Sequence, residues 1–210
     1  MNQIIGVYGA SGCGRGIMPI VRAELKDGDT QLVFIDDGSR DDVVNGHPIW
    51  TFDQFARKNA TRRAAVLAVA NSRVRAALDK RCDEAGVAIT GATAANAIIM
   101  DGVEIGPGAL LSPFVTLTSN IRIGRCFHAN LYSYVEHDCS IGEYVTFAPG
   151  VHCNGNVSIG DHAYVGSGAM IRQGVTIGAR AVVGMGAVVT KDVPKDATVV
   201  GNPARPLGKS

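Results

Sequence analysis

Apolar residues recur at every sixth position through the C-terminal half of the chain. The first series is unbroken: Ile99, Ile105, Leu111, Leu117, Ile123, Ala129, Val135, Ile141, Phe147, Cys153, Ile159, Val165, Ile171, Ile177, Val183 and Val189. A second series starts four residues later, at Val103, and reaches Val193 with Ser133 as its one polar member. A period of six fits neither an amphipathic helix nor an alternating strand. The pattern predicts a β-solenoid, in which short faces joined by bends stack as hydrogen-bonded coils.

The first 94 residues follow a different pattern, in which apolar runs alternate with helical segments. We expect strands over residues 4–8, 31–36 and 64–70, and helices over 16–25, 52–58 and 73–85. Alternating strands and helices imply a small parallel sheet, so this half is predicted to be a Rossmann-like α/β unit. The chain is therefore expected to contain two domains, residues 1–94 and 95–210.

A glycine-rich turn connects the first predicted strand to the first predicted helix, from Gly9 to Gly14. Backbone N–H groups at a helix N-terminus can bind a phosphate, and Asp36 and Asp37 at the end of the next strand can hold a ribose or a base. A nicotinamide-dependent oxidoreductase would need a second mononucleotide half as well, but the repeat begins instead. Two interpretations stay open: the turn grips a nucleotide, or its glycines serve tight packing alone.

Charge and cysteine content narrow the classes of partner. The 210 residues include 20 Lys and Arg against 19 Asp and Glu, a balance that argues against a nucleic-acid or membrane-surface partner. The five Cys show no close pairing, and Cys139 and Cys153 fall in the apolar series, so we expect buried thiols and no metal. No charged leader and no apolar run of membrane length are visible, which favours a cytoplasmic protein.

His137 is the strongest candidate for chemistry from the residues themselves. It lies two positions after inward Val135, where a side chain should point outward, and it is the one His flanked by two carboxylates, Glu136 and Asp138. A neutral imidazole can accept a proton near pH 7, and a carboxylate on its other nitrogen fixes the tautomer. The alternative is a surface His between surface acids.

Short motifs in both halves resemble one family. They are Gly9–Gly14 (GASGCG), Ile35–Asp37, Asn71–Arg73, Asn130, Val135–Asp138 (VEHD), Cys153–Asn156 and Gly201–Arg205. On these motifs the chain resembles the hexapeptide-repeat acyltransferases, and among them the nucleotide-sugar N-acetyltransferases of the bacillosamine and perosamine pathways and the sialic acid O-acetyltransferases. The resemblance implies a left-handed parallel β-helix with three faces per coil, about five coils in all, and a homotrimer.

The resemblance also implies roles for individual residues. His137 would be the general base, oriented by its acidic neighbour, and the Gly155 N–H would donate to the oxygen of a tetrahedral intermediate. Asn130 would lie at the substrate end of the site; its alternative is an Asn that fills a coil corner. The acceptor, a nucleotide sugar, would contact Gly9, Ser11, Gly12, Cys13, Asp36, Asp37, Asn71 and Arg73.

Acetyl-CoA, the implied cosubstrate, would lie in a groove between adjacent subunits. The matching positions include Ser167 and Met185, and the cofactor's phosphates would end near a basic group formed by Lys191, Lys195, Arg205 and Lys209. The alternative for this basic group is a solvated tail.

The predicted reaction is acetyl-CoA-dependent N-acetylation of the 4-amino group of a nucleotide-linked 4-amino-4,6-dideoxysugar. O-acetylation of a sialic or related sugar acid would use the same base on a hydroxyl, and a non-catalytic trimeric scaffold would not need His137. Departures from some relatives at Cys13, Gly38 and Thr146 leave UDP, GDP and dTDP open as the nucleotide.

Overall fold

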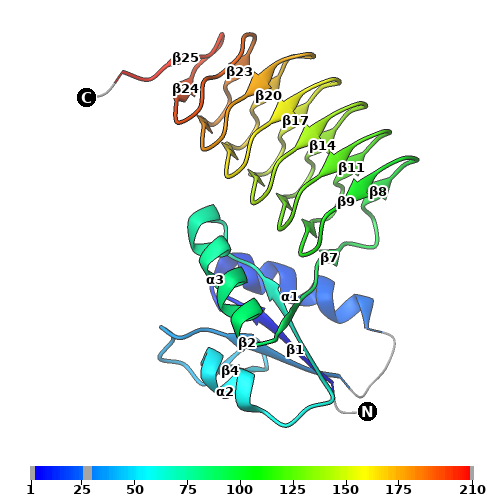
Figure 1. Cartoon of the computed structure of the whole chain (residues 1–210), viewed down its shortest axis with the longest axis vertical. Coiled ribbons are helices and arrows are strands. Elements are labelled where there is room, and N and C mark those ends of the chain that lie inside the picture. The colour runs from blue at the N-terminus through cyan, green and yellow to red at the C-terminus, as the bar shows by residue number, and fades with distance from the viewer. Residues whose placement is uncertain (1–2, 26–29, 209–210) are drawn as a thin grey trace. The chain divides into compact units, whose positions relative to one another are not determined.

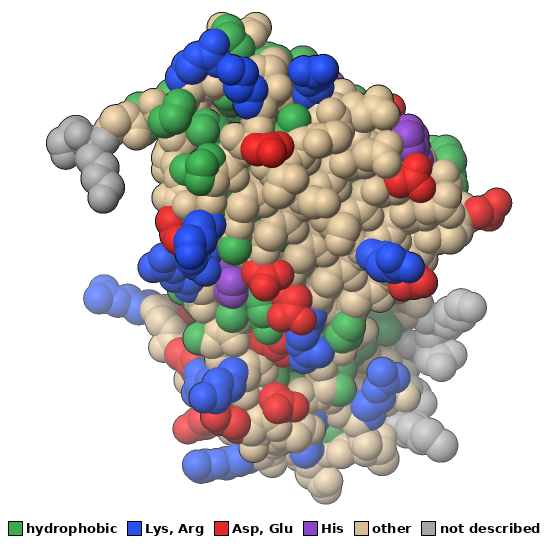
Figure 2. Space-filling model, turned by 45° about the horizontal axis from the view of Figure 1, so that its top comes forward, with side chains coloured by type: hydrophobic (Ala, Val, Ile, Leu, Met, Phe, Trp, Pro, Cys, Tyr) green, Lys and Arg blue, Asp and Glu red, His purple; other side chains and the backbone are tan. Residues whose placement is uncertain are grey.

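The computed structural model describes residues 3–25 and 30–208, and the chain divides into two compact units at residues 95 and 96 (Figure 1). Lys209 of the predicted basic group lies outside the described residues. No helix within the described ranges is long and apolar enough to cross a membrane. Figure 2 shows Lys and Arg side chains interspersed with Asp and Glu over the face in view, in line with the balanced charge of the sequence.

The first unit is built on a mostly parallel sheet with the strand order β3-β4-β2-β1-β5-β6. Its strands are β1 (Gln3–Tyr8), β2 (Thr30–Ile35), β3 (Val43–Val44), β4 (His47–Trp50), β5 (Arg62–Leu67) and β6 (Ala88–Ile89). β1 is central and pairs in parallel with β2 and β5, while β3 and β4 form an antiparallel edge hairpin. The predicted parallel sheet is confirmed, and the hairpin is an addition that the hydrophobic pattern did not indicate.

Three helices complete this unit: α1 (Gly12–Glu24), α2 (Phe52–Arg57) and α3 (Ser72–Glu84). α1 begins four residues earlier than predicted, inside the glycine-rich turn. A Cβ at Gly14 would lie 1.7 Å from the carbonyl oxygen of Gly9, so glycine is required there for the helix to start against the turn. The short strand β7 (Ala92–Thr93) closes the unit, where the Thr93 N–H donates to Glu24 Oε1 at 2.8 Å.

The second unit is a β-helix in which strands 18 residues apart in the sequence are neighbours. Face 1 contains β8 (Ile98–Ile99), β11 (Thr116–Leu117), β14 (Tyr134–Val135), β17 (His152–Cys153), β20 (Met170–Ile171) and β23 (Val188–Val189). Face 2 contains β9 (Glu104–Ile105), β12 (Arg122–Ile123), β15 (Ser140–Ile141), β18 (Ser158–Ile159) and β21 (Thr176–Ile177). Face 3 contains β10 (Leu110–Leu111), β13 (His128–Ala129), β16 (Thr146–Phe147), β19 (Tyr164–Val165), β22 (Val182–Val183), β24 (Thr198–Val200) and β25 (Arg205–Pro206).

The two apolar series fill the interior of these coils, as predicted, except at the start of the first series, where Ile99 is 44% exposed. Core residues from both series, such as Leu117, Val135 and Val157, are at most 1% exposed. The polar exception, Ser133, is also buried, because its hydroxyl donates to the Ala148 carbonyl at 3.1 Å and accepts from the Val151 N–H at 3.2 Å. The sixfold period therefore corresponds to three faces of six residues per coil.

Each coil turns at three corners, which we name by the face they follow. The first corner follows face 1 (residues 100–103, 118–121, 136–139, 154–157 and 172–175), the second follows face 2, and the third follows face 3 (residues 112–115, 130–133, 148–151, 166–169 and 184–187). Residues 18 positions apart occupy equivalent places at one corner, so the corner a residue occupies decides which side chains it can meet.

Candidate functional site

The first corner stacks five residues with left-handed backbone conformation. They are Gly102 (φ +71°), Asn120 (φ 55°), Asp138 (φ 59°), Asn156 (φ 57°) and Gly174 (φ +77°). Gly, Asn and Asp are the residues that adopt this conformation most readily, so the bend itself selects for them. The consequence is that the Asp138 carboxylate lies in a column of small polar side chains beside the candidate base.

His137 and Asp138 form a hydrogen-bonded pair at this corner. The His137 Nδ1 lies 2.8 Å from Asp138 Oδ2, and the two side chains are 45% and 48% exposed. Because a carboxylate oxygen only accepts, the bond places the proton on Nδ1 and leaves Nε2 as an acceptor. The hydrogen bond that His137 donates to Asp138 raises the pKa of His137, and the same bond lowers the pKa of Asp138.

Gly155 packs directly against the imidazole, one coil above His137. A Cβ at Gly155 would lie 2.6 Å from both Cε1 and Nε2 of that ring, so no other residue fits here without moving it. The Gly155 N–H donates to Glu136 Oε2 at 3.1 Å. The two carboxylates beside His137 are therefore distinct: Asp138 holds the imidazole, and Glu136 holds the backbone N–H predicted to serve the reaction.

Two buried thiols lie behind the corner. Cys139 is 2% exposed and Cys153 is fully buried, which confirms the expectation from the apolar series. Cys139 Sγ donates to the Asn154 carbonyl at 3.2 Å and accepts from the Val157 N–H at 3.4 Å. A hydrogen bond between the two thiols raises the pKa of Cys153 and lowers that of Cys139. These sulfurs tie the coil of His137 to the coil of Gly155.

Three other predicted site residues lie at the third corner, not at the first. Asn130 and Met185 are exposed there, Met185 by 80%, and Ser167 is half-buried. The Asn130 Oδ1 accepts from the Leu131 N–H at 2.8 Å, as expected of an Asn that shapes a corner. Within one chain, face 1 separates these residues from His137. Arg205 is exposed in β25, where its guanidinium donates to the Ala204 carbonyl at 2.9 Å.

The glycine-rich turn of the α/β unit lies at the carboxyl end of β1. Gly9 has a φ of +99°, and its N–H donates to the Ile35 carbonyl at 2.8 Å. Ser11 is the N-cap of α1 without a side-chain cap, and the N–H groups of the first helical turn, which begins at Gly12, have no partner within the helix. Asp36 Oδ2 accepts from the Ala10 N–H at 3.0 Å, and burial raises the pKa of the Cys13 thiol.

Asp37 is held by residues that the sequence analysis did not single out. Its carboxylate accepts from Tyr8 Oη at 2.9 Å, from the Phe52 N–H at 2.8 Å and from Arg81 at 2.5 Å. Arg81 also lies over the ring of Phe52, 4.3 Å from its centroid. These bonds hold the pKa of Asp37 below its ordinary value against the opposing effect of burial. Asp37 thus fixes the fold around the turn through contacts inside the unit.

Asn71 and Arg73 lie where α3 begins. The Asn71 Oδ1 accepts from the N–H groups of Arg73 and Val74 at 3.0 and 3.1 Å, a complete N-cap. The Arg73 side chain is exposed. The structure therefore gives Asn71 a clear role in the helix and leaves the predicted nucleotide contact of both residues as a hypothesis.

Among the described residues, no group of three or more His, Cys, Asp or Glu side chains could hold a metal ion. Fold and site together thus define a β-helical acyltransferase with a histidine and a backbone N–H at one corner.

Comparisons with known proteins extend this assignment. Residues 156–191 match the model of the hexapeptide repeat of succinyl-transferase. GDP-perosamine N-acetyltransferase of Escherichia coli O157:H7 is 45% identical over 158 residues, covering 74% of this chain and 72% of that protein. WeeI from Acinetobacter baumannii AYE is 52% identical in structure-based alignment, with a TM-score of 0.93 over 98% of this chain and all of that chain.

A further solved structure was determined with a ligand. The acetyltransferase domain of PglB from Neisseria gonorrhoeae FA1090, in complex with acetyl coenzyme A, has a TM-score of 0.90 at 29% identity, over 99% of this chain and all of that chain. The chain belongs to the hexapeptide-repeat acetyltransferases, in the family of GDP-perosamine N-acetyltransferase. It is an acetyltransferase whose acyl donor is acetyl-CoA.

Proposed function

We propose that this protein is a homotrimer of left-handed β-helices that acetylates the 4-amino group of a nucleotide-linked 4-amino-4,6-dideoxysugar. The observation that carries the proposal is the pairing of His137 with Asp138, with the imidazole packed directly against Gly155. The relatives support the amine as nucleophile, since a curated protein 45% identical to this chain is named for N-acetylation. O-acetylation of a sugar acid is the alternative outcome of the test below.

His137 acts as the general base through Nε2. In the neutral imidazole, the Asp138 carboxylate fixes the Nδ1–H tautomer, which leaves the Nε2 lone pair to accept a proton. The sugar amine attacks the thioester carbonyl with its lone pair, and Nε2 takes the proton that the attacking nitrogen releases. Asp138 then stabilises the imidazolium that forms. Collapse of the tetrahedral intermediate then breaks the carbon–sulfur bond, the imidazolium gives its proton to the departing sulfur, and coenzyme A leaves as the thiol.

The Gly155 N–H supplies the donor for the intermediate's oxygen. Support comes from its present acceptor, a carboxylate oxygen of Glu136, which is itself a negatively charged oxygen at hydrogen-bond distance. A developing oxyanion takes the same donor once the Glu136 side chain turns aside. The lack of a side chain at Gly155 leaves room for the imidazole to pack against this residue.

The trimer is part of the proposal because one chain does not bring the predicted site together. His137 lies at the first corner, whereas Asn130, Ser167 and Met185 lie at the third. Exposed apolar side chains on face 1 and the third corner offer a contact surface for a neighbour, among them Ile98, Phe114, Tyr132, Met170 and Met185. A third corner from one subunit and a first corner from the next would complete each site.

Mixing two inactive variants tests the shared site. His137→Ala damages the first corner and Ser167→Trp blocks the third, so each homotrimer should be inactive. When the two are refolded together in equal amounts, about one quarter of the sites combine two intact corners, and activity should return to that level. Activity that stays absent in verified mixed trimers would rule out a site shared between chains.

The α/β unit is proposed to bind the nucleotide of the acceptor. The first-turn N–H groups of α1, from Gly12 onward, are suited to the diphosphate, and we propose that Ser11, Cys13, Asp36 and Arg73 contact the rest of the nucleotide. The base that the α/β unit recognises determines whether the nucleotide is UDP, GDP or dTDP. Isothermal titration with the three free diphosphates, in wild type and Ser11→Trp, tests this assignment; equal binding by the two proteins would contradict it.

The reaction itself is tested by the release of coenzyme A thiol from acetyl-CoA. The panel contains UDP-, GDP- and dTDP-linked 4-amino-4,6-dideoxysugars and free sialic acid, each with wild type and His137→Ala. Turnover of an amino sugar that the variant loses is the expected result. Turnover of sialic acid alone would replace N-acetylation with O-acetylation, and undiminished turnover by the variant would remove His137 as the base.

A further inference from the structure

We propose that Asn120 is a positioning residue for the catalytic histidine, acting through Asp138 from the coil below. The proposal rests on the role assigned to His137 under the proposed function. Asn120 Nδ2 donates to Asp138 Oδ1 at 3.3 Å, and Asp138 Oδ2 lies 2.8 Å from His137 Nδ1. The three side chains form a line, amide to carboxylate to imidazole, in which each oxygen of the carboxylate has its own partner.

The stacking of coils makes this line a built feature. Asn120 and Asp138 are 18 residues apart and occupy equivalent places in the left-handed column of the first corner. The backbone is tied at the same point, because the Asp138 N–H donates to the Ser119 carbonyl at 3.0 Å. Gly102 completes the support from below, since its hypothetical Cβ would lie 2.8 Å from Asn120 Oδ1. Asn120 is exposed, and it lies between the coils of Gly102 and Asp138 with its amide nitrogen within hydrogen-bond distance of Asp138.

Asn120 orients the Asp138 carboxylate, as Asp138 orients the His137 imidazole. A half-exposed carboxylate can rotate about its Cβ–Cγ bond, which moves Oδ2 away from the imidazole. Solvent also competes for both oxygens. A hydrogen bond from the Asn120 amide to Oδ1 fixes the orientation of the Asp138 carboxylate. Oδ2 then stays in position to accept from His137 Nδ1. After the bond from His137, the bond from Asn120 is the next largest influence that lowers the pKa of Asp138, which keeps the carboxylate ionised.

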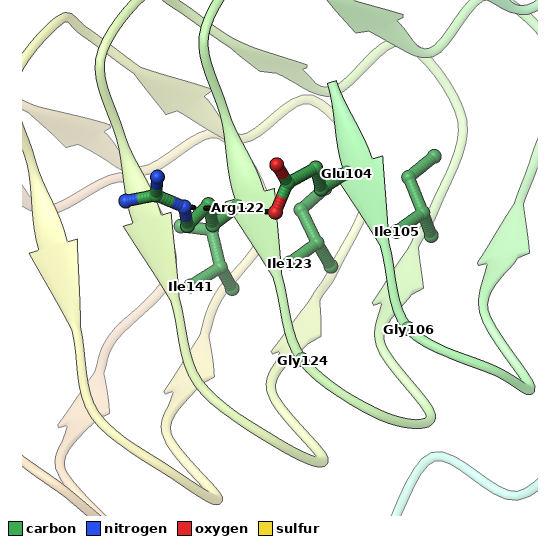
Figure 3. Close-up of a pocket in the computed structure, with 7 residues that line it drawn as sticks. All are labelled: Glu104, Ile105, Gly106, Arg122, Ile123, Gly124 and Ile141. Atoms are coloured by element: carbon green, nitrogen blue, oxygen red, sulfur yellow. Dashed lines mark ion pairs between the residues drawn. The ribbon is translucent and has the colours of Figure 1, made fainter. Parts of the chain in front are cut away.

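The charged groups around the line are few and identifiable. Glu136 and Cys139 act on His137 from its own corner. Across face 2, a depression of about 460 Å³ is lined by Asn120 and Asp138 together with Glu104 and Arg122. Arg122 Nε lies 3.6 Å from Glu104 Oε2, on neighbouring strands (Figure 3). This pairing directs the guanidinium toward Glu104, so the neutral amide of Asn120 is the side-chain donor on Asp138 from that side.

Two substitutions at Asn120 separate positioning from backbone conformation, because both tolerate the left-handed bend. Asn120→Gly removes the donor, and Asn120→Asp replaces it with a second carboxylate. The matched control is Asn45→Gly, the same change at a left-handed residue (φ 50°) between β3 and β4 of the α/β unit. The readouts are the His137 ring pKa by NMR titration, and kcat and KM for the acceptor.

Asn120→Gly should lower the His137 pKa toward its ordinary value and reduce kcat about 3- to 10-fold, with KM changed less than about twofold. Asn120→Asp should move the pKa the opposite way, because it adds negative charge, and should reduce kcat as well. Asn45→Gly should change neither quantity. An unshifted His137 pKa in Asn120→Gly, or an equal loss of kcat in Asn45→Gly, would overturn the proposal. Because the titration needs no substrate, it still tests Asn120 if the proposed acetylation fails.

Discussion

The first corner of the β-helix and the carboxyl edge of the α/β sheet hold their acidic residues by different means. Asp138 takes its partners from the adjacent residue and from the residue 18 positions earlier. Asp37 takes its partners from 15, 29 and 44 residues away. The first arrangement follows from a repeat, and the second from a tertiary fold. A side chain in a repeat is thus positioned by its coil, while one in the α/β unit depends on several elements packing together.

Loss of the imidazole should have the largest effect. His137→Ala should reduce kcat/KM by about 10² to 10⁴, the usual contribution of a general base, with the melting temperature unchanged because the side chain is half-exposed. His162→Ala is the control, since His162 lies at the second corner stacked on Tyr144. The measurement is thiol release under saturating acetyl-CoA, and a variant that stays within a few-fold of wild type would remove the first corner from the chemistry.

Adding one methyl group above the imidazole should be nearly as damaging. Gly155→Ala places a Cβ 2.6 Å from Cε1 and Nε2 of His137, so the ring must swing away from its position. We expect kcat to fall about 10²-fold, because an ångström of misplacement is enough for that loss. Gly16→Ala in α1, where a Cβ meets nothing within 4 Å, should keep full activity. Equal activity of the two variants would mean that the imidazole position does not matter.

Asp138 and Glu136 should have different effects on the pH dependence of kcat/KM. The Asp138 bond raises the His137 pKa, so the acid limb of kcat/KM should lie above pH 6.5, the ordinary value. Asp138→Asn should move this limb to lower pH and reduce kcat about tenfold. Glu136→Gln, which removes a weaker charge effect, should move it less. A larger shift in Glu136→Gln than in Asp138→Asn would reverse the assignment of the two acids.

The same pair has a consequence for stability. Because the pKa of His137 is raised in the folded protein, its contribution is fully present below the unfolded pKa and is lost as pH rises through the folded pKa. The difference in melting temperature between wild type and Asp138→Asn should therefore shrink as pH rises through that value.

The smallest expected effect is on stability and concerns Asp37 in the α/β unit. Asp37→Asn removes charge from bonds to Tyr8, Phe52 and Arg81, and it should lower the free energy of unfolding by about 1 kcal/mol, since the carboxylate is partly exposed. The pKa of Asp37 is lowered in the folded state, so this stability is present above the unfolded pKa and lost as pH falls through the folded one.

Urea unfolding at pH 7 and at pH 3 measures this difference. Asp83→Asn, an exposed carboxylate in α3, serves as the control. A deficit of Asp37→Asn that is equal at the two pH values would contradict an ionic origin.

The sequence predicted the β-helix well because its signal is periodic. Inward positions such as Leu117, Val135 and Cys153 follow from counting by six, and the buried thiols follow from the same count. The column of Gly102, Asn120, Asp138, Asn156 and Gly174 is also readable, since residues that favour the left-handed bend recur every 18 positions. That signal identifies Asn120 as a neighbour of Asp138, although the analysis of single motifs missed it.

The sequence does not show which role each of several neighbouring residues takes. Glu136 and Asp138 flank His137 symmetrically in sequence, and only side-chain geometry shows that one bonds Nδ1 while the other accepts from Gly155. In the α/β unit, Arg81 carries no sequence signal that links it to Asp37, because the two meet through the packing of α3 near β1 and β2. The β3–β4 hairpin was missed because its short strands carry too few apolar positions to form a pattern.

The 18-residue coil also sets which changes in chain length the protein tolerates. Deleting one residue between β14 and β17 would move the later inward side chains of face 1 to the wrong place, because the strands of that face pair in an 18-residue register. Removing or duplicating a whole coil far from His137 leaves the register intact and changes only the height of the stack. The length of the β-helix can therefore change, by evolution or by design, in units of one coil without altering the corner where the chemistry is placed.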